Sequence, residues 1–198
     1  MEHTRLSKMT VGQYQLLNEI DGELPVMEQN IYAVAAIKDI TYEEASKVKL
    51  KDFAVMIAEL GEFNIKQLEK LKINSRIILN GSVYHVEHKP EKLTSGQLLD
   101  IINIRSKYQG EGVKVMDLIL AAISKPEGKN YGDDNLSLNE RAALIRGMEL
   151  DKVWSIFVFF WNLWNDYLSS TEDSLSKWMR DTLAMTREIL DNDGDSLA

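Results

Sequence analysis

The sequence lacks cysteine altogether and has only three histidines, His3, His85 and His88, among its 198 residues. Without cysteine the chain has no disulfide, zinc knuckle, iron–sulfur cluster or thiol nucleophile. Three imidazoles also leave little material for general-base catalysis or metal binding. These absences point away from an enzyme, and we expect no cofactor.

Positive charge is the second shortage. The 23 Lys and Arg residues are outnumbered by 31 Asp and Glu residues, so the formal net charge is −8 at pH 7. Affinity for a phosphate backbone comes mainly from Lys and Arg that displace counterions. We therefore expect no direct contact with nucleic acid.

A long apolar run is also missing. The most apolar stretch, residues 153–165, has 13 uncharged residues that include Asn162 and Asn165. A membrane-spanning helix needs about 20 predominantly apolar residues. The first ten residues are charged and lack the apolar centre of a signal peptide. We expect no membrane contact and a cytoplasmic protein.

Helix-start signals are abundant. Capping boxes, in which a hydroxyl residue is followed three positions later by Gln or Glu, begin at Thr10, Thr41, Thr94 and Ser137. They predict helices over 10–20, 41–46, 94–107 and 137–150. Apolar spacing adds helices over 26–38, 51–60, 65–72 and 113–124, and then two long ones over 151–169 and 172–190.

One segment has the pattern of a β-hairpin. Residues that favour strands lie on both sides of Asn80-Gly81, a pair that accepts the positive φ angles of a type I′ turn. Strands are predicted over 75–79 and 82–87. The predicted fold class is mainly α (α+β), a helical protein with one inserted β-hairpin near 75–87 and a C-terminal pair of long helices.

The turn-rich segment 125–135 is the best candidate for a domain boundary. It divides the chain into an N-terminal helical part with the β-hairpin (1–124) and a C-terminal helical hairpin (137–190). Residues 191–198 follow as an acidic tail. A single continuous domain with an exposed loop is the alternative.

A short pattern occurs twice. Residues 8–14 and 92–98 both read Lys-apolar-Thr-x-Gly-Gln, followed by Tyr14 or Leu98. We interpret the repeat as one helix-start chemistry used twice. An internal duplication is the alternative, although the sequences that follow diverge.

The polar clusters do not resemble catalytic or metal sites. His85 and His88 are three residues apart, which places them on opposite faces of a strand. The aspartates of the tail 191–198 lack the glycine and glutamate positions of a calcium loop. Asp133 and Asp134 fit a solvated loop better than a cation site. We assign no catalytic residue and no metal ligand.

The aromatic run near the C-terminus is the most informative feature. Apolar residues surround nearly the whole of the predicted helix, which must therefore be buried on several sides. One interpretation is a central core helix; the other is a helix that binds a partner, because Trp is enriched at interface anchors. The candidate partner-binding residues are Trp154, Phe157, Phe160, Trp161 and Trp164.

The order of these motifs resembles a known family. The helix-opening sequence Met9–Tyr14 is followed by Thr41–Glu44, by Val48–Phe53, by the hairpin with Val83–Val86 and by Lys92–Gln97. This order, over roughly residues 5–105, resembles small virion-assembly and tail-assembly proteins of tailed bacteriophages, crAss-like gut phages in particular. The C-terminal aromatic helix is similar only in general character.

The resemblance implies a non-enzymatic tail-assembly chaperone or virion structural component. Its partners would be other phage structural or tail proteins, or further copies of itself as a homo-oligomer. It would act in the host cytoplasm during assembly and could stay in the virion. Two alternatives remain: a regulatory adaptor that binds a single host protein, and an enzyme with scattered carboxylates such as Glu43, Glu44 and Asp52.

The interface interpretation of the aromatic helix predicts the effect of Trp161→Ala. The substitution should weaken assembly and leave the monomer folded, because an interface anchor contributes to binding rather than to folding. Assembly can be measured by size-exclusion chromatography, and helix content by circular dichroism. Loss of the helical signal in the variant would instead assign Trp161 to the core.

Overall fold

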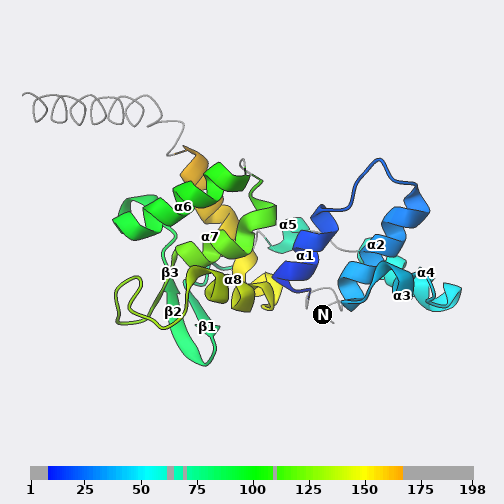
Figure 1. The fold of residues 1–198 in the computed structure, drawn as a ribbon, viewed down its shortest axis with the longest axis horizontal. Helices are drawn as coiled ribbons and strands as arrows, with labels where there is room; N and C mark the ends of the chain where they lie inside the picture. The colour runs from blue at the N-terminus through cyan, green and yellow to red at the C-terminus, as the bar shows by residue number, and fades with distance from the viewer. Residues whose placement is uncertain (1–8, 62–64, 69–70, 109–110, 167–198) are drawn as a thin grey trace, which may run out of the picture. The chain divides into compact units, whose positions relative to one another are not determined.

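The computed structural model describes residues 9–61, 65–68, 71–108 and 111–166 (Figure 1). Its contacts divide the chain into two compact units, residues 1–160 and 161–198. In the second unit the described residues are 161–166, and all six are helical. The fold described below is that of the first unit.

Helices account for most of the described residues. They are α1 (Val11–Asn18), α2 (Val26–Lys38), α3 (Tyr42–Ala45), α4 (Leu50–Gly61), α5 (Ile65–Leu68), α6 (Ser95–Tyr108), α7 (Met116–Ala122) and α8 (Leu138–Arg146). Short 3₁₀ helices η2 (Pro90–Lys92) and η3 (Val113–Val115) precede α6 and α7, and a further helix covers 150–166. In the described part of the chain no helix is both long and apolar enough to cross a membrane.

The predicted capping boxes are confirmed at all four positions. The hydroxyls of Thr10, Thr41 and Ser137 each accept a hydrogen bond from the backbone N–H three residues later, and the Gln or Glu there accepts one in return. Thr94 and Gln97 make the same reciprocal pair, at 3.3 and 3.1 Å. These local hydrogen bonds explain why the helix starts could be read from the sequence.

The predicted hairpin is present as β1 (Arg76–Leu79) and β2 (Ser82–Val86). Asn80 and Gly81 have φ values of 48° and 78°, as a type I′ turn requires. A third strand that the sequence did not predict, β3 (Ser124–Pro126), pairs antiparallel with β2. The fold class, mainly helical α+β, is confirmed, and the single hairpin is corrected to a three-stranded antiparallel sheet.

Pro126 explains why the sequence did not predict β3. Pro126 has no N–H to give to a strand ladder, and prolines are therefore read as breaks in β-structure. Here β3 is an edge strand, where a missing donor is tolerated. Glu127 N–H, just beyond the strand, donates to the Val83 carbonyl at 2.9 Å and continues the pairing.

Side chains alternate across the hairpin. Ile77, Leu79, Tyr84 and Val86 are buried, whereas the cross-strand partners Ile78 and Val83 are exposed. One face of the sheet therefore belongs to the core, and the other faces solvent.

The main core surrounds α7. Met116, Ile119 and Leu120 are fully buried there, and α7 contacts α1, α6 and α8. A second, smaller cluster lies on α2, α3 and α4, where Val34, Ala45 and Phe53 pack together. Helix α1 contacts both α2 and the α7–α8 side, so it joins the two clusters.

Contacts cross the predicted domain boundary at 125–135. Strand β3 joins the sheet, and Tyr131, from the loop that follows, donates a hydrogen bond to Asp100 on α6. The compact unit continues to residue 160. The division at 125–135 and its single-domain alternative both stay predictions. The predicted helix over 172–190 and the acidic tail 191–198 lie outside the described residues.

The repeated Thr-x-Gly-Gln pattern has a packing explanation. At both helix starts the glycine lies against a residue from a later part of the chain: Gly12 against Arg146 at the end of α8, and Gly96 against the ring of Tyr131 in the loop before α8. The chain next to Gly12 is also bonded directly, because Val11 N–H donates to the Met148 carbonyl at 2.9 Å. The interpretation as one helix-start chemistry used twice accounts for both copies.

We predict that Gly12→Ala destabilises the protein. An alanine Cβ would lie 2.8 Å from Arg146 Cγ and 3.2 Å from the Arg146 carbonyl oxygen. Overpacking of about 1–3 kcal/mol should outweigh the gain in helix propensity, about 1 kcal/mol. Urea denaturation measures the free energy of unfolding.

The matched control is Gly22→Ala, because no atom lies within 4 Å of a Cβ at that position. It should be neutral or stabilising by up to about 1 kcal/mol. A Gly12→Ala protein as stable as the wild type would show that the contact with Arg146 is not tight.

Candidate functional site

Most of the predicted partner-binding residues are interior. Trp154, Phe157, Phe160 and Trp164 are buried, and Trp161 is partly exposed. The Trp154 ring meets the Tyr14 ring edge-on, with centroids 5.2 Å apart, which adds a specific aromatic contact to the core. In this conformation the four buried side chains offer no surface to a partner, as the core-helix alternative expects. The interface hypothesis for Trp161 stays a prediction.

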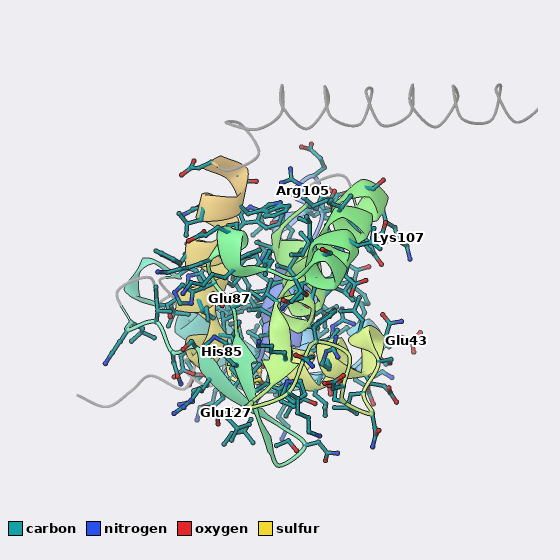
Figure 2. The ribbon with its side chains drawn as sticks, turned by 90° about the vertical axis from the view of Figure 1, so that its left-hand side faces the viewer. Glu43, His85, Glu87, Arg105, Lys107 and Glu127 are labelled. Carbon is teal, nitrogen blue, oxygen red and sulfur yellow. The ribbon has the colours of Figure 1, made fainter. Side chains whose placement is uncertain are left out.

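The histidine pair does not form a ligand cluster. His85 lies on β2 with its Nε2 atom 3.8 Å from the Glu87 carboxylate (Figure 2). The His88 ring instead contacts the ring of Phe159, with centroids 5.5 Å apart. Among the described residues no three His, Cys, Asp or Glu side chains are grouped so that they could hold a metal ion.

The carboxylates named for the enzyme alternative have ordinary surroundings. Glu43 and Asp52 are exposed on α3 and α4. Glu44 belongs to the capping box, where hydrogen bonds from the Thr41 backbone and side chain lower its pKa.

The Asp134 side chain is buried, although most of the loop around it, Asp133 included, is exposed. Its carboxylate and the Arg141 guanidinium form a buried ion pair, in which Arg141 Nη1 lies 3.0 and 3.2 Å from the two carboxylate oxygens. The Tyr84 hydroxyl donates to the same carboxylate at 2.8 Å. The interpretation of Asp134 as a solvated residue was wrong, because Arg141 covers its carboxylate. The sequence alone does not show that this arginine, seven positions later, folds back onto Asp134.

The network extends to α6 through Tyr131. Arg141 Nη2 donates to the Tyr131 hydroxyl at 3.2 Å, and its guanidinium lies over the Tyr131 ring. The Tyr131 hydroxyl in turn donates to Asp100. Burial and the nearby carboxylate of Asp100 raise the pKa of Tyr131 well above its usual range. This cluster connects β2, the loop, α6 and α8, which makes it a structural clamp.

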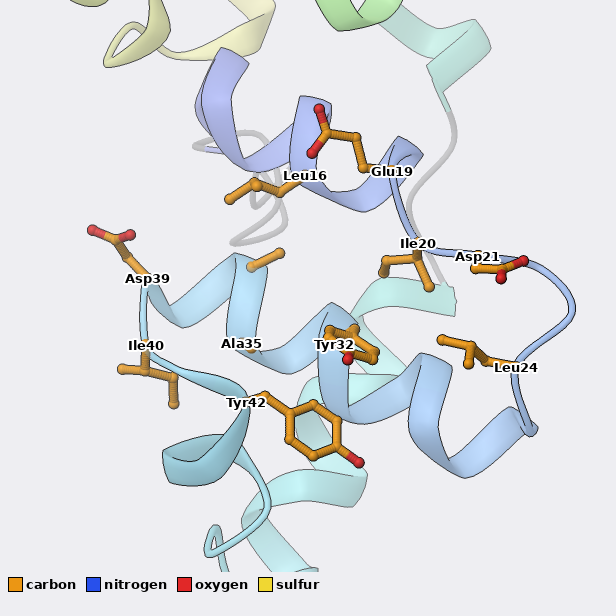
Figure 3. Close-up of a pocket in the computed structure, with 11 residues that line it drawn as sticks. Leu16, Glu19, Ile20, Asp21, Leu24, Tyr32, Ala35, Asp39, Ile40 and Tyr42 are labelled. Carbon is orange, nitrogen blue, oxygen red and sulfur yellow. The ribbon is translucent and has the colours of Figure 1, made fainter.

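A surface pocket of about 480 Å³ lies between α1 and α2 (Figure 3). Its apolar lining comes from the end of α1, the loop 19–25, α2 and the start of α3. We call this cavity the α1–α2 pocket. Its apolar lining includes Leu16, Ile20, Leu24, Tyr32, Ile40 and Tyr42. Leu16 and Tyr32 are each 42 % exposed, so apolar surface is open to solvent at this place.

Several contacts hold the pocket walls in position. Gln13 Nε2 donates to the Ile37 carbonyl at 2.7 Å and so connects α1 to α2. Gln29 Nε2 donates to the carbonyls of Gly22 and Leu24, which fastens the loop to α2. On the opposite side the Tyr32 and Tyr42 rings pack with centroids 4.6 Å apart. The pocket is therefore preformed.

The pocket is bordered by negative charge. Glu19, Asp21 and Asp39 lie at its edge, with their carboxylates near solvent (Figure 3). Residues 16–44 contain seven acidic residues and one lysine, which amounts to −6 of the chain's formal charge of −8. The acidity of the protein is thus concentrated in the segment that builds the pocket.

Sequence reading missed this site. The helix over 26–38 and the box at Thr41 were predicted, but nothing local shows that Ile20, Tyr32 and Tyr42 meet in space. The signal that could have drawn attention to it is the uneven charge, because seven of 31 acidic residues and only one of 23 basic residues fall within 16–44.

Comparison with family models, with curated protein sequences and with solved structures finds no match to this chain. The site is therefore interpreted from its own geometry and charge.

We predict that Tyr84 makes stability sensitive to alkaline pH. Burial and the hydrogen bond to Asp134 raise the pKa of Tyr84 to about 12 from its ordinary value of 10.0. Below pH 10 both folded and unfolded chains keep the proton; above it the unfolded chain loses the proton first. The free energy of unfolding should therefore fall as pH rises from 10 towards 12, by on the order of 2 kcal/mol.

Tyr84→Phe should remove this part of the pH dependence, as measured by urea denaturation from about pH 9 to about pH 11.5. Tyr108→Phe, which changes an exposed ring on α6, is the matched control and should follow the wild type. If Tyr84→Phe and the wild type lose stability in parallel, the Tyr84 hydroxyl is not held by Asp134 in solution.

Proposed function

We propose that this chain is a non-enzymatic protein that acts by protein–protein contact in the assembly of a bacteriophage particle. The resemblance of residues 5–105 to small phage assembly proteins supports the biological setting. The α1–α2 pocket supports the mode of action, because it joins exposed apolar surface to a one-sided charge. Exposed apolar patches bordered by polar residues are typical of protein-binding sites.

The pocket is the observation that carries the proposal. A contact surface must be accessible, and the pocket residues Leu16 and Tyr32 are exposed, whereas the aromatic residues Trp154, Phe157 and Phe160 are buried. The pocket carboxylates are also accessible to a partner. This arrangement fits recognition of another chain better than a reaction, which needs converging catalytic groups.

Within this role we favour a tail-assembly chaperone or a virion structural component that acts in the host cytoplasm. The partners would be other phage structural or tail proteins, and further copies of the chain are a second option. The alternative function is a regulatory adaptor that binds a single host protein. An adaptor would use the same pocket but would act outside any particle.

Quantitative mass spectrometry of purified particles and of the crude lysate tests the proposal. We expect the chain in phage-producing lysates, because an assembly protein is present while particles form. A fixed ratio to a capsid protein in the particles would identify a virion component. Presence in the lysate and absence from the particles would identify a chaperone that leaves before completion.

A culture that expresses the chain and makes no particles would overturn the phage assignment. The adaptor would then be the leading function, and the chain should be recovered as a monomer or dimer with one host protein. A denatured lysate spiked with the pure chain is the control for detection.

A further inference from the structure

We propose that the α1–α2 pocket receives a basic amphipathic helix of a partner protein, with apolar side chains in the pocket and Lys or Arg at its edge. The inference rests on the proposed function as a protein-binding chain and specifies the chemistry of the partner. It follows from three independent features of the pocket: its shape, its charge and the contacts that hold it open.

The shape fits a helix that inserts apolar anchors. The pocket lies between two helices, and its volume of about 480 Å³ has room for more than one aliphatic side chain. Its floor contains Ala35 and Ala36, whose small side chains leave the space between the flanking Leu16, Ile20 and Tyr32 open. An amphipathic helix laid in such a groove presents anchors at i, i+3 or i+4, and i+7.

The charge determines which kind of helix fits. Three carboxylates border the pocket, and its lining includes no Lys or Arg among the residues that the structure describes. Lys114, a cation whose charge interacts with Glu19, already pairs with Glu111 at 2.6 Å. Lys38 is the single basic residue among the seven acidic ones of residues 16–44. A partner that brings Lys or Arg would therefore meet an unbalanced negative edge, whereas an acidic one would be repelled.

Charge also argues against a second copy as the occupant. In a symmetric pair the same acidic segment would lie on both sides of the interface, and each copy carries −6 over residues 16–44, so the two copies would repel each other.

The contacts that hold the pocket walls favour binding of the helix. The hydrogen bonds of Gln13 and Gln29 reduce the ordering that binding would require, because the groove exists before the partner arrives.

Fluorescence anisotropy with a defined peptide tests the inference on the full chain. The probe is a fluorescein-labelled helical peptide of Leu and Lys, with Leu at i, i+3, i+4 and i+7 and Lys elsewhere. A second peptide has Glu in place of every Lys. We expect the wild type to bind the Lys peptide, with weaker binding as salt rises, and to bind the Glu peptide at least tenfold more weakly.

The decisive variant is Glu19→Gln with Asp39→Asn. Asn tolerates the positive φ of 53° at position 39, so the fold should be kept. The matched control, Glu91→Gln with Asp133→Asn, removes the same charge from exposed positions outside the pocket. We expect the pocket variant to bind the Lys peptide about tenfold more weakly and the control to bind like the wild type.

Two leucine variants test whether the Lys peptide contacts the pocket lining. Leu16→Ala should weaken binding about tenfold, because Leu16 is an exposed part of the lining. Leu99→Ala changes a leucine that is exposed on α6 and should leave binding unchanged. Circular dichroism of every variant checks that the helix content is retained.

Three results would overturn the inference: no binding of the Lys peptide by the wild type, equal binding of the Glu peptide, or equal weakening in the pocket and control charge variants. The last result would show attraction by net charge alone. The mass spectrometry of particles is independent of these results. Detection of the chain in a particle-producing culture without peptide binding would reject the basic helix and keep the assembly role. Peptide binding by a chain whose source culture makes no particles would reject the assembly role alone.

Discussion

The buried ion pair between Arg141 and Asp134 is the interaction on which the rest of the fold depends. Both side chains are almost fully enclosed, so each charge needs the other in place of water. Through Tyr84 and Tyr131 the pair connects the sheet and α6 to α8. Loss of one partner would leave a buried charge unbalanced, which costs about 3–5 kcal/mol in comparable cases. The polar loop between β3 and α8 is mostly exposed, yet it contributes the buried Asp134 side chain to the interior of the fold.

Helix α1 connects the main core to the α1–α2 pocket. Its start is bonded to the chain after α8, through Val11 N–H and the Met148 carbonyl, and Gly12 lies against Arg146. Its far end supplies Leu16 to the α1–α2 pocket, the loop that follows supplies Ile20, and Gln13 connects the helix to α2. The same short helix thus packs on the main core with one side and lines the α1–α2 pocket with the other.

Local features of the fold were predictable, and long-range ones were not. The boundaries of α2, the four capping boxes and the Asn80-Gly81 turn were predicted because each depends on residues within a few positions of one another. Strand β3 was missed because its partner β2 lies about 40 residues away and Pro126 disguises it. The aromatic residues were correctly recognised as needing burial, but sequence could not say whether their own fold or a partner would cover them. The pocket was missed for the same reason, since its walls come from four segments.

The sequence by itself determined the helical fold class, the helix starts, the hairpin turn and the concentration of acidic charge in residues 16–44. These follow from hydrogen bonds, periodicity and composition along a few residues of chain. Only the tertiary structure decided that Trp154 and Phe160 are interior, that Asp134 is paired, and that the acidic segment surrounds an open apolar pocket. The reason is physical: burial and ion pairing depend on which distant segments meet, and that is settled by the packing of the whole chain.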